Sequence, residues 1–441
     1  MKHLDAIVIG GGVLGCFAAR NLRRWNISTL LLEAEDDVCR GITRANTAIV
    51  YAGYDNKPGS LKAGMTVRGN AHFDQLCEDL DVPFSRCGSL MVSFGENGDK
   101  VIRKKLKQGM ANGVPGLRIL TGEEAREMEP MLAKTVTSAL YAPTTGTVNP
   151  WKLGIAAFEN AIHNGCEVRL NTPVLGIRAE EKGYLVQTET ETYLCKAVVN
   201  CAGIDAENIH SMVFESKVKL EVNGTDFLVL DKYAPKPERI IFHEAESGKG
   251  ITAVPCVEGN LLLDSPARPL GIPYGTSREG MDFIRETAAD VLPQVDTTRV
   301  IRSFGAVRPN PRREDGKNLP DYCIEEPVPG FISFIGIKTP GLTCAEELGM
   351  YAAKKCAEHL GAESNPGFDP VRKGIPRGND REIICQCEQV TKSESLEAIR
   401  RGAGTVDAVK RRVNSGMGSC QGSRCSYAIR RILEESGYGT L

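Results

Sequence analysis

The chain has 441 residues, of which 25% are charged and 41% are hydrophobic, and its formal net charge is −2. This length can bury a large core and predicts two or three domains. The balanced charge argues against a nucleic-acid-binding protein, and no stretch reaches the roughly 18 apolar residues that a membrane-spanning helix needs. We therefore expect a cytoplasmic protein, whose fifteen cysteines are thiols or metal ligands rather than a disulfide framework.

The N-terminal segment, "LDAIVIGGGVLGCFAARNLRRWNISTLLLEAE", predicts a strand, a glycine turn, a helix and a second strand. Gly10, Gly12 and Gly15 fit G-x-G-x-x-G directly after an apolar run. The first glycine permits a tight turn, the second lets backbone N–H groups approach a pyrophosphate, and the third lets the helix pack on the strand. Glu33 ends the second strand, where a carboxylate accepts ribose hydroxyls and disfavours a 2′-phosphate. The segment predicts a dinucleotide site at a helix N-terminus.

Two later segments also bring glycines to the end of an apolar strand. "KAVVNCAGIDAENI" (196–209) ends its apolar run at Ala202 and Gly203, and "GFISFIGIKTPGLTCAEELGMYAAKKC" (330–356) places a glycine-rich turn before a helix. Three glycine contacts so far apart in the chain predict a large, elongated cofactor. The residues that the late turn would bring to it are Gly336, Gly341, Leu342 and Thr343.

The middle of the chain alternates strand-like runs such as "SLMVSF", "FLVLD" and "NLLLD" with turns. This pattern predicts an antiparallel-sheet substrate domain, formed by about residues 76–149 and 206–324, that packs against the nucleotide-binding part. The expected fold class is therefore α/β, with a Rossmann-like domain, an inserted α+β substrate domain and the binding site between them. The Rossmann-like part would comprise about residues 1–75, 150–205 and 325–363.

The set of GxGxxG with Glu33, NxAG and the late G-x-x-x-x-G-x-T resembles the FAD-dependent oxidoreductase family of D-amino-acid oxidase and glycerol-3-phosphate dehydrogenase. Residues 41–63, "GITRANTAIVYAGYDNKPGSLKA", resemble its glycerol-3-phosphate and L-2-hydroxyglutarate dehydrogenase branch. The resemblance covers about residues 1–350 and implies FAD as the cofactor. It also implies that Thr43, Asn46 and Thr47 lie by the pyrophosphate and the flavin ring, and that the backbone of Val174 contacts the adenine side.

Tyr51 departs from this family pattern, since relatives often carry a histidine there, which in some flavoproteins bonds covalently to the ring. We therefore expect noncovalent FAD, and the most obvious catalytic base is missing. His243, in "IIFHEAESGKG", is the leading alternative, because an imidazole accepts a proton near neutral pH. Tyr51 and Lys62 follow as candidate bases, and an exposed or core-packed histidine is the competing interpretation of His243.

Arg308, in "VIRSFGAVRPNPRRED" (300–315), directly precedes a proline after a strand-like run, a context that implies, by resemblance, binding of the substrate's carboxylate or phosphate. Its planar fork can donate two parallel hydrogen bonds to an oxyanion. A surface arginine is the alternative. Lys338 lies in the late flavin turn and, with Arg308, would make a site for an anionic substrate. Lys338 could equally stabilise a reduced flavin or point to solvent.

Residues 364–382 are rich in proline, glycine and charge and predict a linker to a small helical domain at 383–441. In that domain Thr391 and Glu394 form a capping-box pattern that opens a helix, and two further short helices follow. Four cysteines flank the first and third helices, and clustered thiolates indicate zinc or an iron–sulfur cluster. Their spacing, C-x-C and C-x₄-C, fits structural zinc less well; they are Cys385, Cys387, Cys420 and Cys425.

The run "KRR…GMGxCQGxxC" resembles the 2Fe–2S domain of the bacterioferritin-associated-ferredoxin type, over residues 383–433. The resemblance implies a 2Fe–2S cluster on the four cysteines. Glycine allows close backbone approach to the sulfurs at Gly416, Gly418 and Gly422. The negative cluster would be offset by helix N-termini and basic side chains. The candidates are Lys410, Arg411, Arg412 and Arg424, and the alternative for the first three is a solvated helix face.

The same pairing of domains occurs in the large subunit of anaerobic glycerol-3-phosphate dehydrogenase. It implies a dehydrogenase that oxidises a small anionic hydroxy compound, glycerol 3-phosphate or a 2-hydroxyacid such as L-2-hydroxyglutarate, by hydride transfer to flavin N5. The cluster would pass electrons to a partner subunit or carrier, through which any membrane contact would be made. The alternatives are an amine or amino-acid dehydrogenase, an electron-relay subunit of a larger dehydrogenase, and a zinc-stabilised module on a flavin oxidase.

Overall fold

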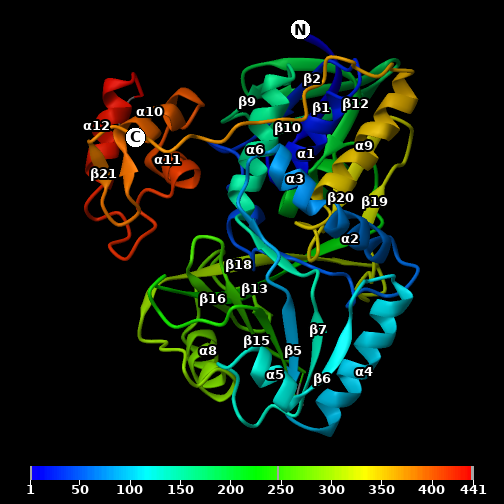
Figure 1. Cartoon of the computed structure of the whole chain (residues 1–441). Helices are drawn as coiled ribbons and strands as arrows, with labels where there is room; N and C mark the ends of the chain where they lie inside the picture. Colours follow the sequence, from blue (N-terminus) through cyan, green and yellow to red (C-terminus); the bar gives the residue numbers. More distant parts are fainter. Residues whose placement is uncertain (1, 246–247, 439–441) are drawn as a thin grey trace.

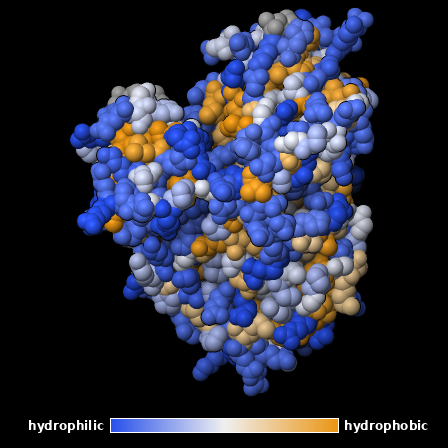
Figure 2. All heavy atoms as spheres, turned by 45° about the horizontal axis from the view of Figure 1, so that its top comes forward, coloured by the Kyte–Doolittle hydropathy of each residue, from blue (hydrophilic) through white to orange (hydrophobic). Residues whose placement is uncertain are grey.

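In the computed structural model, which describes residues 2–245 and 248–438, two sheets lie one above the other and a small helical lobe stands beside the upper sheet (Figure 1). Seen as spheres, the lobe projects from the side of the main body (Figure 2). Its surface on this face is mostly hydrophilic, with an orange hydrophobic patch. Among the described residues no helix is long and apolar enough to cross a membrane.

The upper sheet is built around strand β1 (Lys2–Ile9), which pairs in parallel with β2 (Thr29–Leu32) and β12 (Thr192–Asn200). Two more parallel pairs extend it, β2 with β9 (Glu167–Arg169) and β12 with β20 (Phe331–Ile335). These strands read as nearly continuous apolar runs because helices cover them. Helix α1 packs against both of its neighbours in this layer; the three helices are α1 (Val13–Leu22), α6 (Pro150–His163) and α9 (Ala345–Leu360).

Antiparallel strands complete the edges of this sheet. A meander of β10 (Val174–Glu180) and β11 (Gly183–Thr188) leads into β12, and β19 (Cys323–Glu325) pairs with β20. The predicted strand–turn–helix–strand unit is β1, α1 and β2. A Cβ on Gly15 would lie 1.8 Å from the carbonyl oxygen of Gly10, so this glycine lets α1 pack closely on the turn.

The lower sheet is mainly antiparallel, in the order β17-β13-β16-β15-β14-β5-β7-β6, with β18 paired to β13. Helix α8 buries Ile284, Ala288 and Val291 against one face of it. The strands are β5 (Ser89–Ser93), β6 (Arg118–Thr121), β7 (Ser138–Ala142), β13 (Lys219–Leu230), β14 (Ile240–Ala245), β15 (Gly248–Pro255), β16 (Leu261–Asp264), β17 (Arg268–Pro269) and β18 (Val300–Arg312). The helices around it are α4 (Glu96–Ala111), α5 (Gly122–Met128) and α8 (Arg278–Val291).

Short elements join the two sheets. A three-stranded sheet combines β3 (Ile49–Val50), β4 (Phe84–Ser85) and β8 (Gly146–Val148). The remaining helices of the body are the 3₁₀ turns η1 (Ile42–Arg44) and η2 (Gly203–Asp205) with α2 (Leu61–Ala71), α3 (Phe73–Asp79) and α7 (Ala206–Ser211). The strands of the lower sheet come from the middle of the chain, which confirms the predicted α/β fold class with a substrate domain inserted into a Rossmann-like domain.

The lobe contains the three predicted helices and a small hairpin. Thr391 and Glu394 form both hydrogen bonds of the capping box at the start of α10, and Asn414 ends α11 in the left-handed conformation. The elements are β21 (Ile383–Cys385), β22 (Val390–Thr391), α10 (Lys392–Arg400), α11 (Val406–Val413) and α12 (Ser426–Glu435). We keep 364–382 as a proposed linker; it lies against α6, where Asn160 Nδ2 donates to the carbonyls of Asp369 and Val371.

Candidate active site and cysteine site

A cavity of about 770 Å³ lies between the two sheets. Its lining comes from the glycine turn after β1, from residues 40–51, from the turn after β12, from residues 337–342 and from the strands of the lower sheet that face them. The cavity therefore runs from the nucleotide-binding fold into the inserted domain. An elongated site of this kind fits a dinucleotide at one end and a small substrate at the other.

The glycine turn shapes the first part of the cavity. Gly10 has a positive φ, and a Cβ there would lie 2.6 Å from the carbonyl oxygen of Cys201. Gly12 lines the cavity, and the Thr43 hydroxyl accepts a hydrogen bond from the backbone N–H of Val13 (3.0 Å). Glu33 also lines it and accepts from the Gly11 N–H (2.5 Å), while burial raises the pKa of its carboxyl group. This cradle is consistent with a bound pyrophosphate and ribose.

Most of the residues that sequence reasoning assigned to the cofactor are brought together by the fold. The further lining residues from that set are Thr43, Asn46, Thr47, Val174, Ala202, Gly203, Gly341 and Leu342. Gly15, Gly336 and Thr343 are not in the lining. The hydroxyl of Thr343 instead accepts from the backbone N–H of Tyr51 (2.9 Å) and so joins the late turn to the 41–51 segment. These three positions support the site from behind.

Tyr51 lies inside the cavity. Its ring stacks on Phe242 at 6.1 Å between centroids, and its hydroxyl lies 3.4 Å from that of Thr47. Burial raises the pKa of the Tyr51 phenol, so the group stays neutral at physiological pH. It can offer a hydrogen bond to a substrate, but it is a poor proton acceptor.

His243 borders the cavity, but its ring is engaged elsewhere. The neighbouring Phe242 faces Tyr51, whereas the imidazole of His243 makes an edge contact with Phe94, 5.1 Å between centroids. Burial lowers the pKa of His243, and the charge that acts on it is that of Asp290 on α8, the helix behind the sheet. Its Nδ1 has no hydrogen-bond partner in the described chain. Of these two neighbours on β14 it is Phe242 that contacts Tyr51, and the role of His243 as the base stays a prediction.

Two cations, Arg308 and Lys338, line the cavity, and a third, Lys62, lies close enough to act on Lys338 electrostatically. Arg308 and Asn310 share one face of β18, and Lys338 Nζ donates to Asn310 Oδ1 (2.8 Å). Burial, followed by the charges of Arg308 and Lys62, lowers the pKa of Lys338 to about 8. Burial also lowers the pKa of Lys62, partly offset by Asp321. In the part of the chain that the structure describes, the Arg308 guanidinium has no hydrogen-bond or ion-pair partner, so it is available to an anion.

The structure also adds residues that the sequence reasoning did not select. Lys249 Nζ lies 2.9 Å from Asp264, which is buried at the end of β16, and both line the cavity. Arg44 lies over the ring of Tyr274, 4.4 Å from its centroid, at another part of the lining. The acidic end of the run "NLLLD" was the available signal for Asp264. Nothing local in the sequence marks Lys249 or Tyr274.

The four cysteines of the lobe form two side-chain pairs, Cys385 with Cys425 and Cys387 with Cys420. The first pair is buried and the second is half-exposed. Burial raises the pKa of Cys420, but the N–H groups of Arg424 and Gly422 and the Cys387 thiol outweigh it and lower the value to about 7. Within residues 2–245 and 248–438, no three histidine, cysteine or acidic side chains are grouped to hold one metal ion. Two pairs fit a two-iron cluster with two thiolates on each iron.

Glycines bring the two cysteine loops together. A Cβ on Gly418 would lie 2.4 Å from the Cβ of Cys387, and one on Gly416 would lie 3.8 Å from the sulfur of Cys425. Gly416 and Gly422 have φ values of +78° and +88°, which favour glycine. Of the basic side chains, Arg424 is exposed beside the loop, but Arg411 and Arg412 bind Asp37 of the main body. The alternative of a solvated helix face is therefore wrong for these two, and their part in offsetting the cluster charge stays a prediction.

Comparison with known proteins agrees with this geometry. The family described as "FAD dependent oxidoreductase" matches residues 5–355, and "BFD-like 2Fe-2S binding domain" matches residues 383–435. The chain is 39% identical to "Glycerol 3-phosphate dehydrogenase" of Caloramator mitchellensis, over 97% of this chain and 93% of that protein. It is 24% identical to "Anaerobic glycerol-3-phosphate dehydrogenase subunit A1" of Haloferax volcanii, over 98% and 83%.

Among solved structures, L-α-glycerophosphate oxidase of Mycoplasma pneumoniae with FAD bound superimposes with a TM-score of 0.77. It is 20% identical and covers 84% of this chain and 99% of its own, so it shows the shared fold. The chain belongs to the FAD-dependent oxidoreductases. It carries in addition a BFD-like 2Fe–2S-binding domain, and the two cofactors expected from the sequence, FAD and a 2Fe–2S cluster, are confirmed.

Proposed function

We propose that this protein is a dehydrogenase that oxidises glycerol 3-phosphate and passes the electrons through its cluster to a partner. The observation that carries the proposal is the pair of Arg308 and Lys338 in the cavity lining, with Lys62 near them and with Arg308 unpaired in the described chain. Burial, together with repulsion from the neighbouring cations, lowers the pKa of both lysines, and a bound anion would relieve both costs.

A phosphate ester suits this site better than a carboxylate. A phosphate dianion can satisfy two cations at once, and an arginine fork can take two of its oxygens. The relative that matches nearly the whole chain is named glycerol 3-phosphate dehydrogenase, which supports the same choice. A 2-hydroxyacid such as L-2-hydroxyglutarate is the second candidate, because its carboxylates would also be bound by Arg308 and Lys338.

The residues of this chain would bind and orient the substrate. Arg308 and Lys338 would hold the anionic group, while the neutral phenol of Tyr51 would donate a hydrogen bond near the hydroxyl to be oxidised. FAD, when bound, supplies the hydride acceptor at N5. The proton of the oxidised hydroxyl would pass to His243, the candidate base that borders the cavity with an unpartnered Nδ1. With tyrosine rather than histidine at position 51, we propose that FAD is held without a covalent bond. Val174 and Glu33 would bind its adenosine half.

We further propose that the acceptor is a partner subunit or a carrier that meets the lobe beside Cys420, which is half-exposed next to the exposed Arg424. A 2Fe–2S cluster supplies one-electron transfer when bound. Any membrane contact would be made by that partner. A cytoplasmic location is part of the proposal, since all fifteen cysteines in the described chain are free thiols.

The proposal is tested with anaerobically purified holoenzyme by recording flavin absorbance after each candidate substrate is added. We expect bleaching within seconds with glycerol 3-phosphate and little with L-2-hydroxyglutarate, glycine or proline. Bleaching by an amine alone would instead assign an amine dehydrogenase. A holoenzyme that no substrate bleaches, but that exchanges electrons with a partner, would assign an electron relay.

The lowered pKa of Lys338 predicts how substrate affinity depends on pH. Lys338 is charged below about pH 8 and loses its charge above it. We therefore expect KM for glycerol 3-phosphate to rise about tenfold per pH unit above pH 8. In Lys338→Met, KM should be high and nearly flat between pH 7.5 and 9.5. A wild-type KM that stays flat while kcat rises through pH 8 would make Lys338 the proton acceptor instead.

A further inference from the structure

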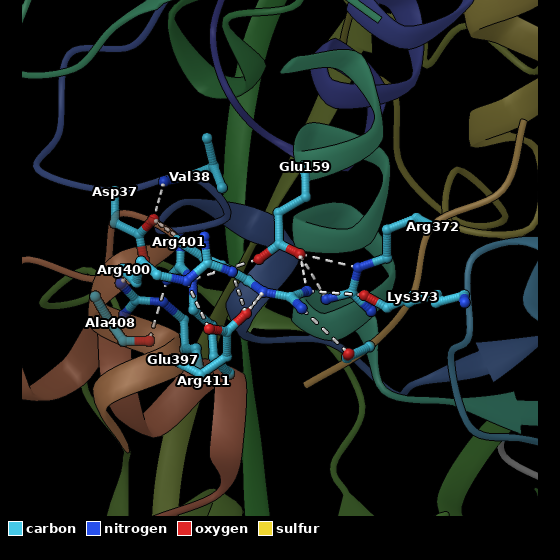
Figure 3. A network of polar contacts seen from close by, with 12 residues as sticks. Asp37, Val38, Glu159, Arg372, Lys373, Glu397, Arg400, Arg401, Ala408 and Arg411 are labelled. Carbon is cyan, nitrogen blue, oxygen red and sulfur yellow. Dashed lines mark hydrogen bonds and ion pairs between the residues drawn. The ribbon is translucent and has the colours of Figure 1, made fainter. Parts of the chain in front are cut away.

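Asp37 is a buried carboxylate in the loop between β2 and η1. It has no exposed surface, although it comes from a loop in which Glu33, Glu35 and Arg40 line the cavity. Asp37 itself lies on the opposite side of that loop, facing the lobe (Figure 3). One loop thus has a cofactor-facing side and a lobe-facing side.

Two arginines of α11 bind this carboxylate. Arg411 Nη2 donates to Asp37 at 2.6 Å, and Arg412 donates from both terminal nitrogens at 2.9 and 3.1 Å. The Val38 N–H donates to the same carboxylate at 2.9 Å. Arg412 is 1% exposed by side chain, so the pair is removed from water. Burial alone would raise the pKa of Asp37, but the two guanidinium groups more than offset this and hold it below the usual value.

A second anchor lies beside the first. Glu159 of α6 accepts from Arg372 of the linker (2.7 and 2.9 Å) and from Arg401 at the end of α10 (3.1 Å), as Figure 3 shows. Arg412 Nε also lies 3.8 Å from Glu159. We call the set of Asp37, Glu159, Arg372, Arg401, Arg411 and Arg412 the arginine clamp. Because it joins linker, lobe and body with buried charges, removing one partner would leave an uncompensated charge.

The loop that carries Asp37 also touches the glycine turn. The Cys39 N–H donates to the Gly11 carbonyl (2.9 Å), and the Gly11 N–H donates to Glu33. Val38 packs where a Cβ on Gly11 would lie, at 2.9 Å. Any ligand that orders Glu33 and the glycine turn therefore also orders the backbone on both sides of Asp37.

Contacts on the other side of the lobe hold the cysteine loops. Lys232 Nζ donates to the Cys387 carbonyl (3.2 Å) and pairs with Glu388 (3.3 Å). Arg302 of β18 donates to the side chain of Gln421, next to Cys420 (3.3 Å). The lobe is thus held against both domains of the body, with its half-exposed cysteine pair beside the substrate domain.

We propose that the arginine clamp couples occupation of the FAD site to docking of the lobe, with Asp37 as its positioning residue. FAD bound against Glu33 stabilises the loop that receives Arg411 and Arg412, and by thermodynamic reciprocity a docked lobe binds FAD more tightly. This inference rests on binding of FAD and is independent of which substrate the enzyme oxidises.

The test uses the full-length chain with and without FAD, and no substrate, so that it does not depend on the proposed reaction. Trypsin can cut the linker after the exposed Lys373 and Arg377. In the wild type, we expect FAD to slow this cleavage about tenfold, within the usual range of allosteric coupling. In Asp37→Ala, FAD should no longer slow it, and the Kd of FAD, measured by titration with flavin fluorescence as the signal, should rise about tenfold.

The matched control is Glu435→Ala, which breaks an exposed ion pair with Arg431 in the same lobe; it should behave as the wild type. If Asp37→Ala does not fold, the triple variant Asp37→Ala/Arg411→Ala/Arg412→Ala leaves no charge of this pair buried and should show the same loss of coupling. Cleavage of either variant that still slows tenfold with FAD, or an unchanged Kd for FAD, would overturn the proposal.

Discussion

Arg308→Leu is expected to lower kcat/KM for glycerol 3-phosphate by about 100- to 1000-fold, which corresponds to about 3–4 kcal/mol. The substrate's phosphate would lose its two-pronged partner, and Lys338 and Lys62 would be left to bind it as point charges. Arg308→Lys should recover part of the loss, because the charge returns without the planar fork. Steady-state kinetics with an artificial dye as acceptor measure this effect without requiring the cluster.

Arg313→Leu is the matched control, since it removes an exposed arginine from the end of the same segment. It should change kcat/KM by less than about twofold. Thermal unfolding of both variants separates a binding effect from a folding defect, and Arg308→Leu should unfold close to the wild-type temperature because its guanidinium makes no hydrogen bond or ion pair within the described protein. An Arg308→Leu enzyme with unchanged turnover would remove the anion-binding role and favour the electron-relay function.

Local patterns in the sequence were sufficient to predict the cofactor-binding fold. The turn at Gly10 and Gly12, the carboxylate of Glu33 and the capping box at Thr391 each depend on residues close together in the chain, and the structure shows each of them. Arg308 was also selected correctly as a cavity residue, because its strand and the following proline define a local context. Its role in binding the substrate remains a prediction.

Side-chain direction and long-range pairing could not be predicted in the same way. His243 lies on β14, where successive side chains point to opposite faces of the sheet. An irregular register between β14 and β15 at this position means that the sequence pattern does not indicate which face His243 takes. Arg411 and Arg412 have a basic pattern that is typical of a solvated helix, yet they are buried by Asp37, a residue from the other end of the chain. A partner so distant in sequence leaves no periodic signal. The pairing of Lys249 with Asp264 across two strands is a further example.

Cys420→Ala is expected to remove the iron and leave the flavin. Cys420 is half-exposed and paired with Cys387, so its loss opens one of the two thiolate pairs. Substitutions of residues that only surround metal ligands already cost about 10- to 100-fold in metal affinity, so the loss of a ligand should cost more. We expect the iron content to fall from about two per chain to near zero. Flavin bleaching by glycerol 3-phosphate should remain within about twofold of the wild type, because the cavity is built from the main body.

The same variant separates the two possible routes for electrons. Reduction of a dye that reacts directly with flavin should persist, whereas reduction of a one-electron carrier protein should fall by at least about 100-fold if the lobe is its only exit. Cys87→Ala, which removes a half-buried thiol of the main body, should affect neither. Carrier reduction that survives the loss of iron would show that electrons leave the flavin directly, and the lobe would then serve to hold the loop at Asp37 rather than to conduct. Metal analysis gives a second test: if the wild-type protein contains zinc that Cys420→Ala loses, the lobe likewise does not conduct electrons and serves to hold the loop at Asp37.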